Sequence, residues 1–409
     1  MTRIGSRPAS LRIGLIADDL TGALDAGAGF AKAGLRSVMP TGPTGTVPLP
    51  VGADVIIFNT ASREGDASVA RERTRQASLR LVGHGVSLIY KKIDSVLRGH
   101  PGAEIAGVLD AIAATHPGAR ALVAPAFPAQ GRTTADGVQL LCGVPVPSHR
   151  GRLDHALAPA IASCDIRDAT TDDDLQLIAR EGVADGRVLW VGSAGLASQI
   201  VEAYRWLASP SETWEIATRG DVPNGSAGSW EAWNSVGPER VIVVAGTAHP
   251  STVMQVEALV ADGWRHIAFD VGNPDGWPDE QEVIEAVTNG STSGVVLSTH
   301  ANLGGYPRTR GVTDPNLVRN AVMLLDRLAL VVTPPLMDGR TGLVVTGGET
   351  AQHLFNGIGV TSVEVSGEAL PGIPVGVMEL GGVRVRVATK SGGFGGSDAL
   401  RHVCGVLVA

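Results

Sequence analysis

The sequence predicts an α/β protein made of two α/β domains with mostly parallel sheets. Short apolar runs alternate with segments of helical periodicity along the chain, a pattern typical of α/β layers. The apolar runs are continuous rather than alternating, as expected for strands that are buried on both faces. With 409 residues the chain exceeds what one hydrophobic core usually supports, so we expect two domains.

Composition excludes several classes of protein. Hydrophobic residues make up 44% of the chain and charged residues 18%, so a packed core is expected rather than disorder. The 33 Lys and Arg against 41 Asp and Glu give a net charge of −8, which argues against non-specific binding of nucleic acid. No apolar run approaches the roughly 20 residues that span a bilayer, and residues 1–10 lack the apolar segment of a secretory signal. Three widely spaced Cys indicate neither a disulfide framework nor a Cys-based metal site, so we expect a cytoplasmic protein.

The first domain is predicted over residues 1–208. Its strands are expected at residues 11–17, 54–58, 86–93, 120–124 and 187–191. Its helices are expected at residues 21–33, 67–82, 101–114 and 194–207, the third with a proline in its first turn, where proline is well tolerated. Residues 209–239 break the pattern with Pro, Gly, Ser, Thr and three Trp residues, and we interpret them as an interdomain connection.

The second domain is predicted over residues 240–409. Its strands are expected at residues 241–245, 266–270, 294–298 and 342–345, and its helices at residues 250–261, 279–287, 315–328 and 349–356. The apolar runs at residues 362–365, 375–378 and 383–388 predict further β-structure near the C-terminus.

Two adjacent carboxylates, Asp18 and Asp19, follow the first predicted strand at the start of the first predicted helix. In open α/β sheets, ligands bind outside the carboxyl ends of the strands. The structural alternative is that one Asp is simply the N-cap of the helix. We interpret one of the pair as the cap and the other as a group that contacts a substrate hydroxyl or a metal.

A charged cluster, KKIDSVLRG, covers residues 91–99 and follows another predicted strand. Such a cluster suits an anionic, hydroxylated ligand, because Arg or Lys binds a carboxylate and Asp accepts a hydrogen bond from a hydroxyl. The alternative is a solvated loop with local ion pairs. The chain has only four lysines and two of them lie here, which favours a function, and Arg63 after a neighbouring strand is expected to add a second guanidinium. For the rigid loop at residues 124–134, a structural role and a binding role are equally compatible with the sequence.

Three glycine-rich turns follow strands of the second domain, AGTAH at residues 245–249, TGGET at residues 346–350 and KSGGFGG at residues 390–396. Backbone N–H groups at helix starts suit phosphates where glycine leaves them uncovered, so the three turns together indicate a nucleotide site. The sequence lacks GxxxxGK[ST] and GxGxxG, which disfavours a P-loop and a Rossmann dinucleotide site. It also lacks HExxH and GxSxG, so we interpret its histidines as surface or core groups and find no serine-hydrolase signal.

Together these motifs resemble the four-carbon acid sugar kinase family over nearly the whole chain. ADDLTGALDAG at residues 17–27, KKIDSVLRG and APAFPAQGRTT at residues 124–134 are similar to its substrate-binding N-terminal domain. VTGGETA at residues 345–351 and KSGGFGG are similar to its nucleotide-binding C-terminal domain. The resemblance implies an ATP-dependent kinase that phosphorylates the terminal C4 hydroxyl of a tetronate such as threonate, erythronate or 3-oxo-tetronate, in sugar-acid catabolism.

The resemblance also implies the site residues. The sugar acid would be bound by Asp18, Asp19, Arg63, Lys92, Asp94, Ser95 and Arg98. ATP would be bound by Gly246, Thr247, His249, Gly347, Gly348, Glu349, Thr350, Lys390, Gly392 and Gly393. The family often has a Ser-rich turn where this chain has AGTAH, so Thr247 keeps one hydroxyl and His249 replaces a Ser.

Phosphoryl transfer is expected in a cleft between the two domains, with Mg²⁺ on the phosphates of ATP. Asp19 and Asp94 are the candidates for the carboxylate that orients the hydroxyl, and the sequence does not choose between them. Lys390 or a group of backbone amides would offset the phosphate charge. The sequence identifies no protein ligands for a metal.

Two other classes remain open at this point, a hydrolase or aldolase that acts on a sugar acid, and a non-catalytic protein that binds a sugar acid or nucleotide. No nucleic acid and no membrane is expected as a partner. The identity of the tetronate and the oligomeric state are left open, with a homodimer as one option.

Overall fold

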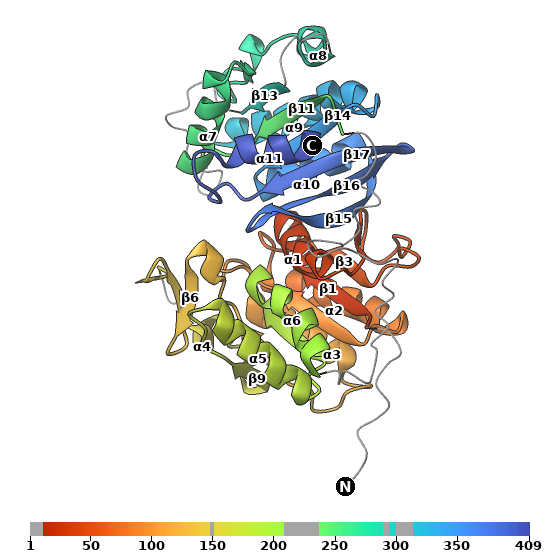
Figure 1. Ribbon diagram of the computed structural model, residues 1–409, viewed down its shortest axis with the longest axis vertical. Coiled ribbons are helices and arrows are strands. Elements are labelled where there is room, and N and C mark those ends of the chain that lie inside the picture. Colours follow the sequence, from red (N-terminus) through yellow and green to blue (C-terminus); the bar gives the residue numbers. More distant parts are fainter. Residues whose placement is uncertain (1–10, 148–150, 208–236, 289–293, 300–313) are drawn as a thin grey trace. The chain divides into compact units, whose positions relative to one another are not determined.

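The computed structural model describes residues 11–147, 151–207, 237–288, 294–299 and 314–409 (Figure 1). The chain divides into two compact units, residues 1–229 and 230–409. The predicted connection at residues 209–239 lies almost entirely outside the described residues, so it and the domain boundaries drawn on either side of it stay predictions. No described helix is long and apolar enough to cross a membrane.

In the N-terminal unit, parallel strands lie in the order β2-β3-β1-β4-β10-β5-β9. The strand β1 is central because it pairs in parallel with both β3 and β4, and all five of its residues are buried. This burial on both faces explains the continuous apolar runs in the sequence. The bounds are β1 Ile13–Ala17, β2 Ser37–Pro40, β3 Val55–Asn59, β4 Leu88–Lys92, β5 Ala121–Ala124, β9 Cys164–Ile166 and β10 Leu189–Gly192.

The helices of this unit pack in two groups, α1 with α6 and α6 with α5 in one, and α2 with α3 in the other. A large apolar cluster joins Ile16 of β1, Phe58 of β3 and Ile105 of α3. The bounds are α1 Leu20–Lys32, α2 Ala67–Gly83, α3 Pro101–Ile112, α4 Leu153–Ala156, α5 Asp172–Ala184 and α6 Ala194–Leu207.

A small antiparallel sheet follows β5 in the chain. It consists of β6 (Arg132–Ala135), β7 (Val138–Leu141) and β8 (Val144–Pro145). The turn between β6 and β7 is Asp136-Gly137, and both residues have positive φ, +51° and +68°. Asp-Gly with this backbone is a favoured two-residue hairpin turn, so it links β6 and β7 tightly.

In the C-terminal unit the strand order is β12-β13-β11-β14-β17-β16-β15. The pairs from β12 to β17 are parallel, and β17, β16 and β15 form an antiparallel meander. The strand bounds are β11 Arg240–Ala245, β12 Arg265–Ala268, β13 Gly294–Ser298, β14 Thr341–Thr346, β15 Val360–Leu370, β16 Ile373–Leu380 and β17 Val383–Lys390. The helix bounds are α7 Pro250–Ala261, α8 Glu280–Thr288, α9 Pro315–Leu336, α10 Gly348–Ile358 and α11 Ala399–Val408.

The mixed α/β class with mostly parallel strands is confirmed, and each predicted strand and helix has a counterpart in the structure. Among the described residues, the strands and α-helices that were not predicted are β2, β9, α4, α5 and α11, together with the small sheet β6–β8. Helix α5 has a clear local signal, because the Thr171 side chain accepts from Asp174 N while the Asp174 carboxylate accepts from the Thr171 backbone N–H. Helix α9 continues to Leu336, beyond the predicted end at residue 328, with two prolines in its last turns.

Candidate functional site

The charged residues predicted in the N-terminal half converge at one edge of its sheet. Asp18 and Asp19 follow β1, Arg63 lies four residues after β3, and residues 94–98 follow β4. The strands β3, β1 and β4 are neighbours and run in parallel, so their carboxyl ends meet at the same edge. We call Asp18, Asp19, Arg63, Lys92, Asp94, Ser95 and Arg98 the acid cluster.

Arg63 is the central cation of the acid cluster. Its Nε and Nη2 donate to the two carboxylate oxygens of Asp18 at 2.7 and 2.8 Å, and Nη2 also donates to Asp19 Oδ1 at 2.6 Å. Asp94 Oδ1 lies 3.8 Å from the same Nη2. Burial alone would raise the pKa of Asp18, but Arg63 outweighs burial and lowers it below its ordinary value. The pKa of Arg63 is raised well above its ordinary value, because three carboxylates outweigh the effect of its burial.

Asp19 is the N-cap of α1. Its Oδ1 accepts from Gly22 N at 3.2 Å, and its Oδ2 accepts from Thr21 Oγ1 at 2.6 Å. The structure therefore assigns the capping role to Asp19, while Asp18 is held by Arg63. A catalytic role of Asp19 stays a prediction, and its side chain is 16% exposed.

Asp94 closes the turn that follows β4. Its Oδ2 accepts from the backbone N–H of Val96 and Arg98, and the Arg98 guanidinium donates to both of its oxygens at 2.9 and 2.7 Å. Burial would raise the pKa of Asp94, but Arg63 and Arg98 lower it well below its ordinary range. Within the turn Leu97 has a φ of +61°, an uncommon backbone for a branched residue.

Lys92 and Ser95 complete the acid cluster. Lys92 is buried, its Nζ donates to Ile93 O at 3.0 Å, and its charge helps to lower the pKa of Asp94. Ser95 is also buried, and its carbonyl accepts from Gln139 Nε2 of β7 at 2.8 Å. The small sheet thus contacts the turn that carries Asp94.

Two glycines allow the backbone to approach these carboxylates. A Cβ on Gly22 would lie 2.4 Å from Asp19 Oδ1, and a Cβ on Gly99 would lie 2.8 Å from Asp18 Oδ2. Gly99 also has a φ of +80°, in the left-handed region that favours glycine. Any side chain at either position would push against the acid cluster.

The structure adds a buried ion pair that sequence reasoning missed. Lys91 Nζ lies 3.0 Å from Glu104 Oε2 of α3, and Glu104 Oε1 accepts from Ser62 Oγ at 3.0 Å. A lysine in a strand with no polar face needs a buried counter-charge, and this signal was available in the sequence. Which acid supplies the charge depends on how α3 packs, and the sequence does not show it.

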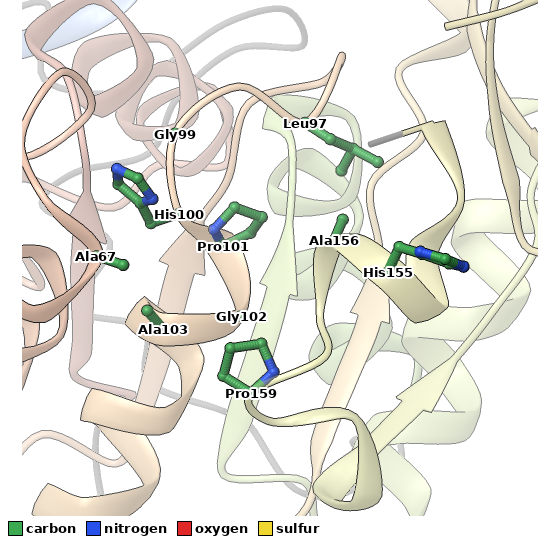
Figure 2. Close-up of a pocket in the computed structure, with 10 residues that line it drawn as sticks. All are labelled: Ala67, Leu97, Gly99, His100, Pro101, Gly102, Ala103, His155, Ala156 and Pro159. Carbon is green, nitrogen blue, oxygen red and sulfur yellow. The ribbon is translucent and has the colours of Figure 1, made fainter. Parts of the chain in front are cut away.

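A pocket of about 200 Å³ adjoins the turn that carries Arg98 (Figure 2). Leu97 and Gly99 line it together with the first turn of α3, and His100 and His155 lie at opposite ends. His100 Nε2 is 2.6 Å from the carbonyl of Gly65. Because its lining residues are small or apolar apart from the two imidazoles, this pocket does not offer the charged groups that a sugar acid would need.

The glycine-rich turns of the C-terminal unit also converge. Residues 246–249 follow β11, residues 347–350 follow β14 and residues 391–396 follow β17, and these three strands are parallel neighbours. A Cβ on Gly246 would lie 2.0 Å from Thr350 Oγ1, and a Cβ on Gly392 would lie 2.8 Å from Thr247 Oγ1. The turns are therefore in contact with one another.

The turn after β14 begins α10 without a side-chain cap. Gly347 is the N-cap with a φ of +96°, and its N–H donates to Lys390 O at 2.9 Å. Gly348 and Glu349 begin the helix, with the Glu349 side chain exposed in the first turn. A helix of 11 residues with glycine at its N-cap and at its first position leaves backbone N–H groups open to an anion.

His249 and Gly393 lie side by side in the remaining two turns. His249 is the N-cap of α7, where its Nδ1 accepts from Ser251 N at 3.2 Å, and its Nε2 lies 3.1 Å from where a Cβ on Gly393 would be. The imidazole therefore already has a structural role in this chain, and its predicted contact with ATP stays a prediction.

Lys390 is fully buried beneath the turn after β17. Its Nζ donates to Ser391 O, Gly392 O and Phe394 O at 2.9 to 3.2 Å, and to Thr252 Oγ1 at 3.2 Å. Burial lowers the pKa of Lys390 to about 7. In this arrangement the ammonium holds the loop together, so a direct contact between Lys390 and a phosphate stays a prediction.

The comparisons with known proteins match both halves of the chain. Residues 13–159 match the family model of a sugar-binding N-terminal domain, and residues 242–400 match that of a nucleotide-binding C-terminal domain. A D-threonate kinase of Cupriavidus necator is 30% identical, over 95% of this chain and 96% of its own. The chain belongs to the four-carbon acid sugar kinase family.

Other members of the four-carbon acid sugar kinase family are similar over the same length. A D-threonate kinase of Bordetella bronchiseptica is 28% identical, over 95% of each chain. A 3-oxo-tetronate kinase of Pseudomonas fluorescens is 27% identical, over 97% of each chain. A crystal structure from Salmonella typhimurium LT2 shares the fold, with a TM-score of 0.73, 19% identity and coverage of 96% of this chain and 98% of that one. The acid cluster lies inside the sugar-binding match and the glycine-rich turns inside the nucleotide-binding match.

No group of three or more His, Cys, Asp or Glu side chains that could hold a metal ion occurs in the part of the chain that the structure describes. Magnesium usually keeps several waters and binds proteins through few ligands together with substrate phosphates. The residues present are therefore compatible with a metal that arrives on ATP.

Proposed function

We propose that this member of the four-carbon acid sugar kinase family transfers the terminal phosphate of ATP to the C4 hydroxyl of a tetronate. Threonate, erythronate and 3-oxo-tetronate are the candidate acceptors, and the names of the relatives support this class. The observation that carries the proposal is the separation of two chemistries. Cations and carboxylates gather at the ends of β3, β1 and β4, and glycine-rich turns gather at the ends of β11, β14 and β17.

In the proposed reaction the C4 oxygen of the sugar acid attacks the terminal phosphorus of ATP. The bond from that phosphorus to the bridging oxygen breaks, ADP leaves, and a carboxylate takes the hydroxyl proton. We favour Asp19 for this role because its side chain is 16% exposed. Asp94 is 7% exposed, and its two oxygens accept four hydrogen bonds against three for Asp19, so Asp94 would be the weaker proton acceptor.

The remaining residues of the acid cluster would bind and orient the sugar acid. Arg98 is 43% exposed, so it can contact a ligand while it holds Asp94. Arg63 would keep Asp18 and Asp19 in place, and Lys92 would add positive charge beneath the substrate.

The glycine-rich turns would bind ATP through backbone N–H groups. The start of α10 at Gly347 and Gly348 suits the phosphates, with Thr247 and Gly392 beside it. Mg²⁺ on the phosphates would neutralise part of their charge. The cleft between the domains, the cytoplasmic location and a homodimer remain predictions.

The test is an ADP-release screen with Mg-ATP over the threonate, erythronate and 3-oxo-tetronate isomers. We expect ADP to form with at least one of them, in equal amount with a phosphorylated product. Absence of ADP with every isomer would contradict the proposal and favour a hydrolase, an aldolase or a non-catalytic binding protein. The variants Asp19→Asn and Asp94→Asn then separate the two carboxylates, because the proposal expects the larger fall in kcat for Asp19→Asn.

A further inference from the structure

Helix α7 directs two buried polar side chains toward the turn after β17. Thr252 and Gln255 lie three residues apart, so they share one face of the helix, and they are 1% and 0% exposed. Gln255 Nε2 donates to three successive carbonyls of the turn. The acceptors are Phe394 O at 3.1 Å, Gly395 O at 3.1 Å and Gly396 O at 2.8 Å. A residue outside the glycine-rich turns, which the sequence motifs did not identify, therefore holds one of these turns.

The three carbonyls fix the orientation of the Gln255 amide. The reverse orientation would place Oε1 against three carbonyl oxygens, all of which are acceptors. In the orientation present, Gln255 Oε1 is buried and has no hydrogen-bond partner among the described residues. An unpaired buried acceptor costs free energy, so the stabilisation that this amide supplies lies in the contacts of its Nε2 with the turn.

The first half of the turn is held from the same side. Thr252 Oγ1 donates to Gly392 O at 2.9 Å, and Lys390 Nζ donates to the carbonyls of Ser391, Gly392 and Phe394. The carbonyl of Phe394 accepts from both Lys390 and Gln255, so these two donors lie on one side of the turn. Five carbonyls of the turn are thus directed toward buried donors.

A peptide group that directs its carbonyl toward these donors directs its N–H the other way. The peptide bond is planar and trans, so a C=O and the N–H that follows it point in opposite directions. Successive N–H groups that face one side of a turn form an anion-binding concavity, and glycine leaves them uncovered. The N–H groups opposite the five carbonyls belong to Gly392, Gly393, Gly395, Gly396 and Ser397.

The turn after β17 lies beside the other two glycine-rich turns. Gly347 N, at the start of α10, donates to Lys390 O at 2.9 Å. A Cβ on Gly392 would lie 2.8 Å from Thr247 Oγ1, in the turn after β11. Phosphates bound at the start of α10, where the proposed function places them, would therefore lie next to the turn after β17.

We propose that Gln255 is a positioning residue for the nucleotide. By holding the carbonyls of the turn after β17 on one side, Gln255 directs the N–H groups of this turn toward the phosphates of ATP. Its own side chain is buried and acts only through the turn. The inference rests on the nucleotide site of the proposed function and adds a residue to it. It predicts that Gln255 contributes to binding of the phosphates and not to binding of the adenosine part.

The experiment measures binding of ADP and of adenosine to the full-length wild type, Gln255→Met and Gln255→Asn. Calorimetry gives the Kd of ADP, and displacement of ADP gives the Kd of adenosine. Methionine keeps the length of the side chain without the donor, and asparagine keeps the amide but shortens its reach by one methylene. Loss of hydrogen bonds to a charged group gives about a ten- to hundred-fold effect. We expect the Kd of ADP to rise by about that factor in Gln255→Met and by less in Gln255→Asn, with the Kd of adenosine near the wild-type value.

The matched control is Gln281→Met, which removes an exposed amide of the same unit that donates to Glu285 Oε1 at 3.0 Å. This control should leave both dissociation constants unchanged. A wild-type Kd of ADP in Gln255→Met, or equal losses for ADP and adenosine, would overturn the inference. Gln255→Asn answers the same question if Gln255→Met does not fold.

The titration separates this inference from the proposed function, because it needs no sugar acid and no turnover. If the wild type binds ADP but phosphorylates no tetronate, the kinase proposal fails, and the same titration still decides the role of Gln255. If the wild type binds no ADP, the nucleotide site and this inference fail together.

Discussion

Lys91 and Glu104 form an ion pair in which the side chains are 0% and 1% exposed. The pair connects three elements, because Glu104 belongs to α3, Lys91 to β4, and Ser62 after β3 donates to Glu104. Lys91 Nζ also donates to Lys92 O at 2.7 Å, so one ammonium and one carboxylate fix the backbone next to Arg63 and Lys92. The buried pair of Lys91 and Glu104 thus holds the backbone that carries Arg63 and Lys92 of the acid cluster.

Replacing Glu104 with Gln should destabilise the protein strongly, because the Lys91 ammonium would stay buried without its counter-charge. Loss of one partner of a buried pair costs about 3–5 kcal/mol. The double variant Lys91→Met, Glu104→Leu should recover much of this loss, since a buried pair exchanged for apolar residues of similar volume is often neutral. Urea denaturation gives the free energy of unfolding of each variant. If Glu104→Gln were as stable as the wild type, the assignment of Lys91 and Glu104 as a buried ion pair would be contradicted.

The control for this prediction is the exposed pair Arg71–Asp110, whose side chains are 51% and 41% exposed. An exposed ion pair contributes about 0–1 kcal/mol. Arg71→Ala should therefore change the free energy of unfolding far less than Glu104→Gln does.

Gly99→Ala should reduce both stability and activity, and Gly85→Ala should reduce stability alone. The two glycines have nearly the same φ, +80° and +79°, so alanine would strain the backbone to nearly the same extent at both positions. A Cβ at position 99 would lie 2.8 Å from Asp18 Oδ2, whereas at position 85 no described atom lies within 4 Å. Melting temperatures and kcat/KM for the best tetronate test this. Equal activity losses in the two variants would mean that the contact with Asp18 has no functional effect.

Lys390 should make the stability of the protein depend on pH above neutrality. Its pKa is about 7 in the folded chain against an ordinary value of 10.5, so between these values the unfolded chain holds a proton that the folded chain has released. The free energy of unfolding should therefore rise with pH through this window, by at most about 1.4 kcal/mol per pH unit. Lys390→Met should remove this contribution to the slope, and Lys32→Met, at an exposed position, should retain it. Identical slopes in wild type and Lys390→Met would show that the buried ammonium keeps its proton.

Gly348→Val should weaken ADP binding by at least about ten-fold, because a branched side chain would cover the N–H groups at the start of α10. Calorimetry with ADP measures the effect, and the KM for the tetronate should stay near the wild-type value. Gly405→Val is the matched control, since no described atom lies within 4 Å of a Cβ there. Unchanged ADP affinity in Gly348→Val would remove this helix start from the nucleotide site.

The convergence of the acid cluster could be predicted from the sequence because it follows from strand order. Parallel strands place their carboxyl ends at one edge of the sheet, so the polar groups after β1, β3 and β4 were expected at that edge. That these three strands are neighbours is shown by the structure. The pairing of Arg63 with Asp18 could not be predicted. It depends on how far the loop after β3 reaches across β1, which no local pattern encodes.

The small sheet and Lys390 show two further limits of sequence reasoning. The Asp136-Gly137 turn was a local signal for a hairpin, but β6 and β7 have four residues each, too short for a reliable alternation. Lys390 or a group of backbone amides was expected to offset phosphate charge. In the structure the Lys390 Nζ donates to oxygens of its own loop, and its role at a phosphate stays a prediction. Whether a lysine points at a ligand or into the loop beneath it depends on the path of the backbone, and the residue types do not determine that path.

The burial of three of its four lysines leaves the folded chain a single exposed lysine side chain for amine-reactive reagents. The four lysines are Lys32, Lys91, Lys92 and Lys390. The last three are 0%, 4% and 0% exposed, while Lys32 is exposed at the end of α1. An acylating reagent should therefore modify Lys32 quickly, and the other three lysines only when their own unit opens. Mass spectrometry of the labelled peptides would then time the opening of each unit separately, with Lys91 and Lys92 reporting on one and Lys390 on the other.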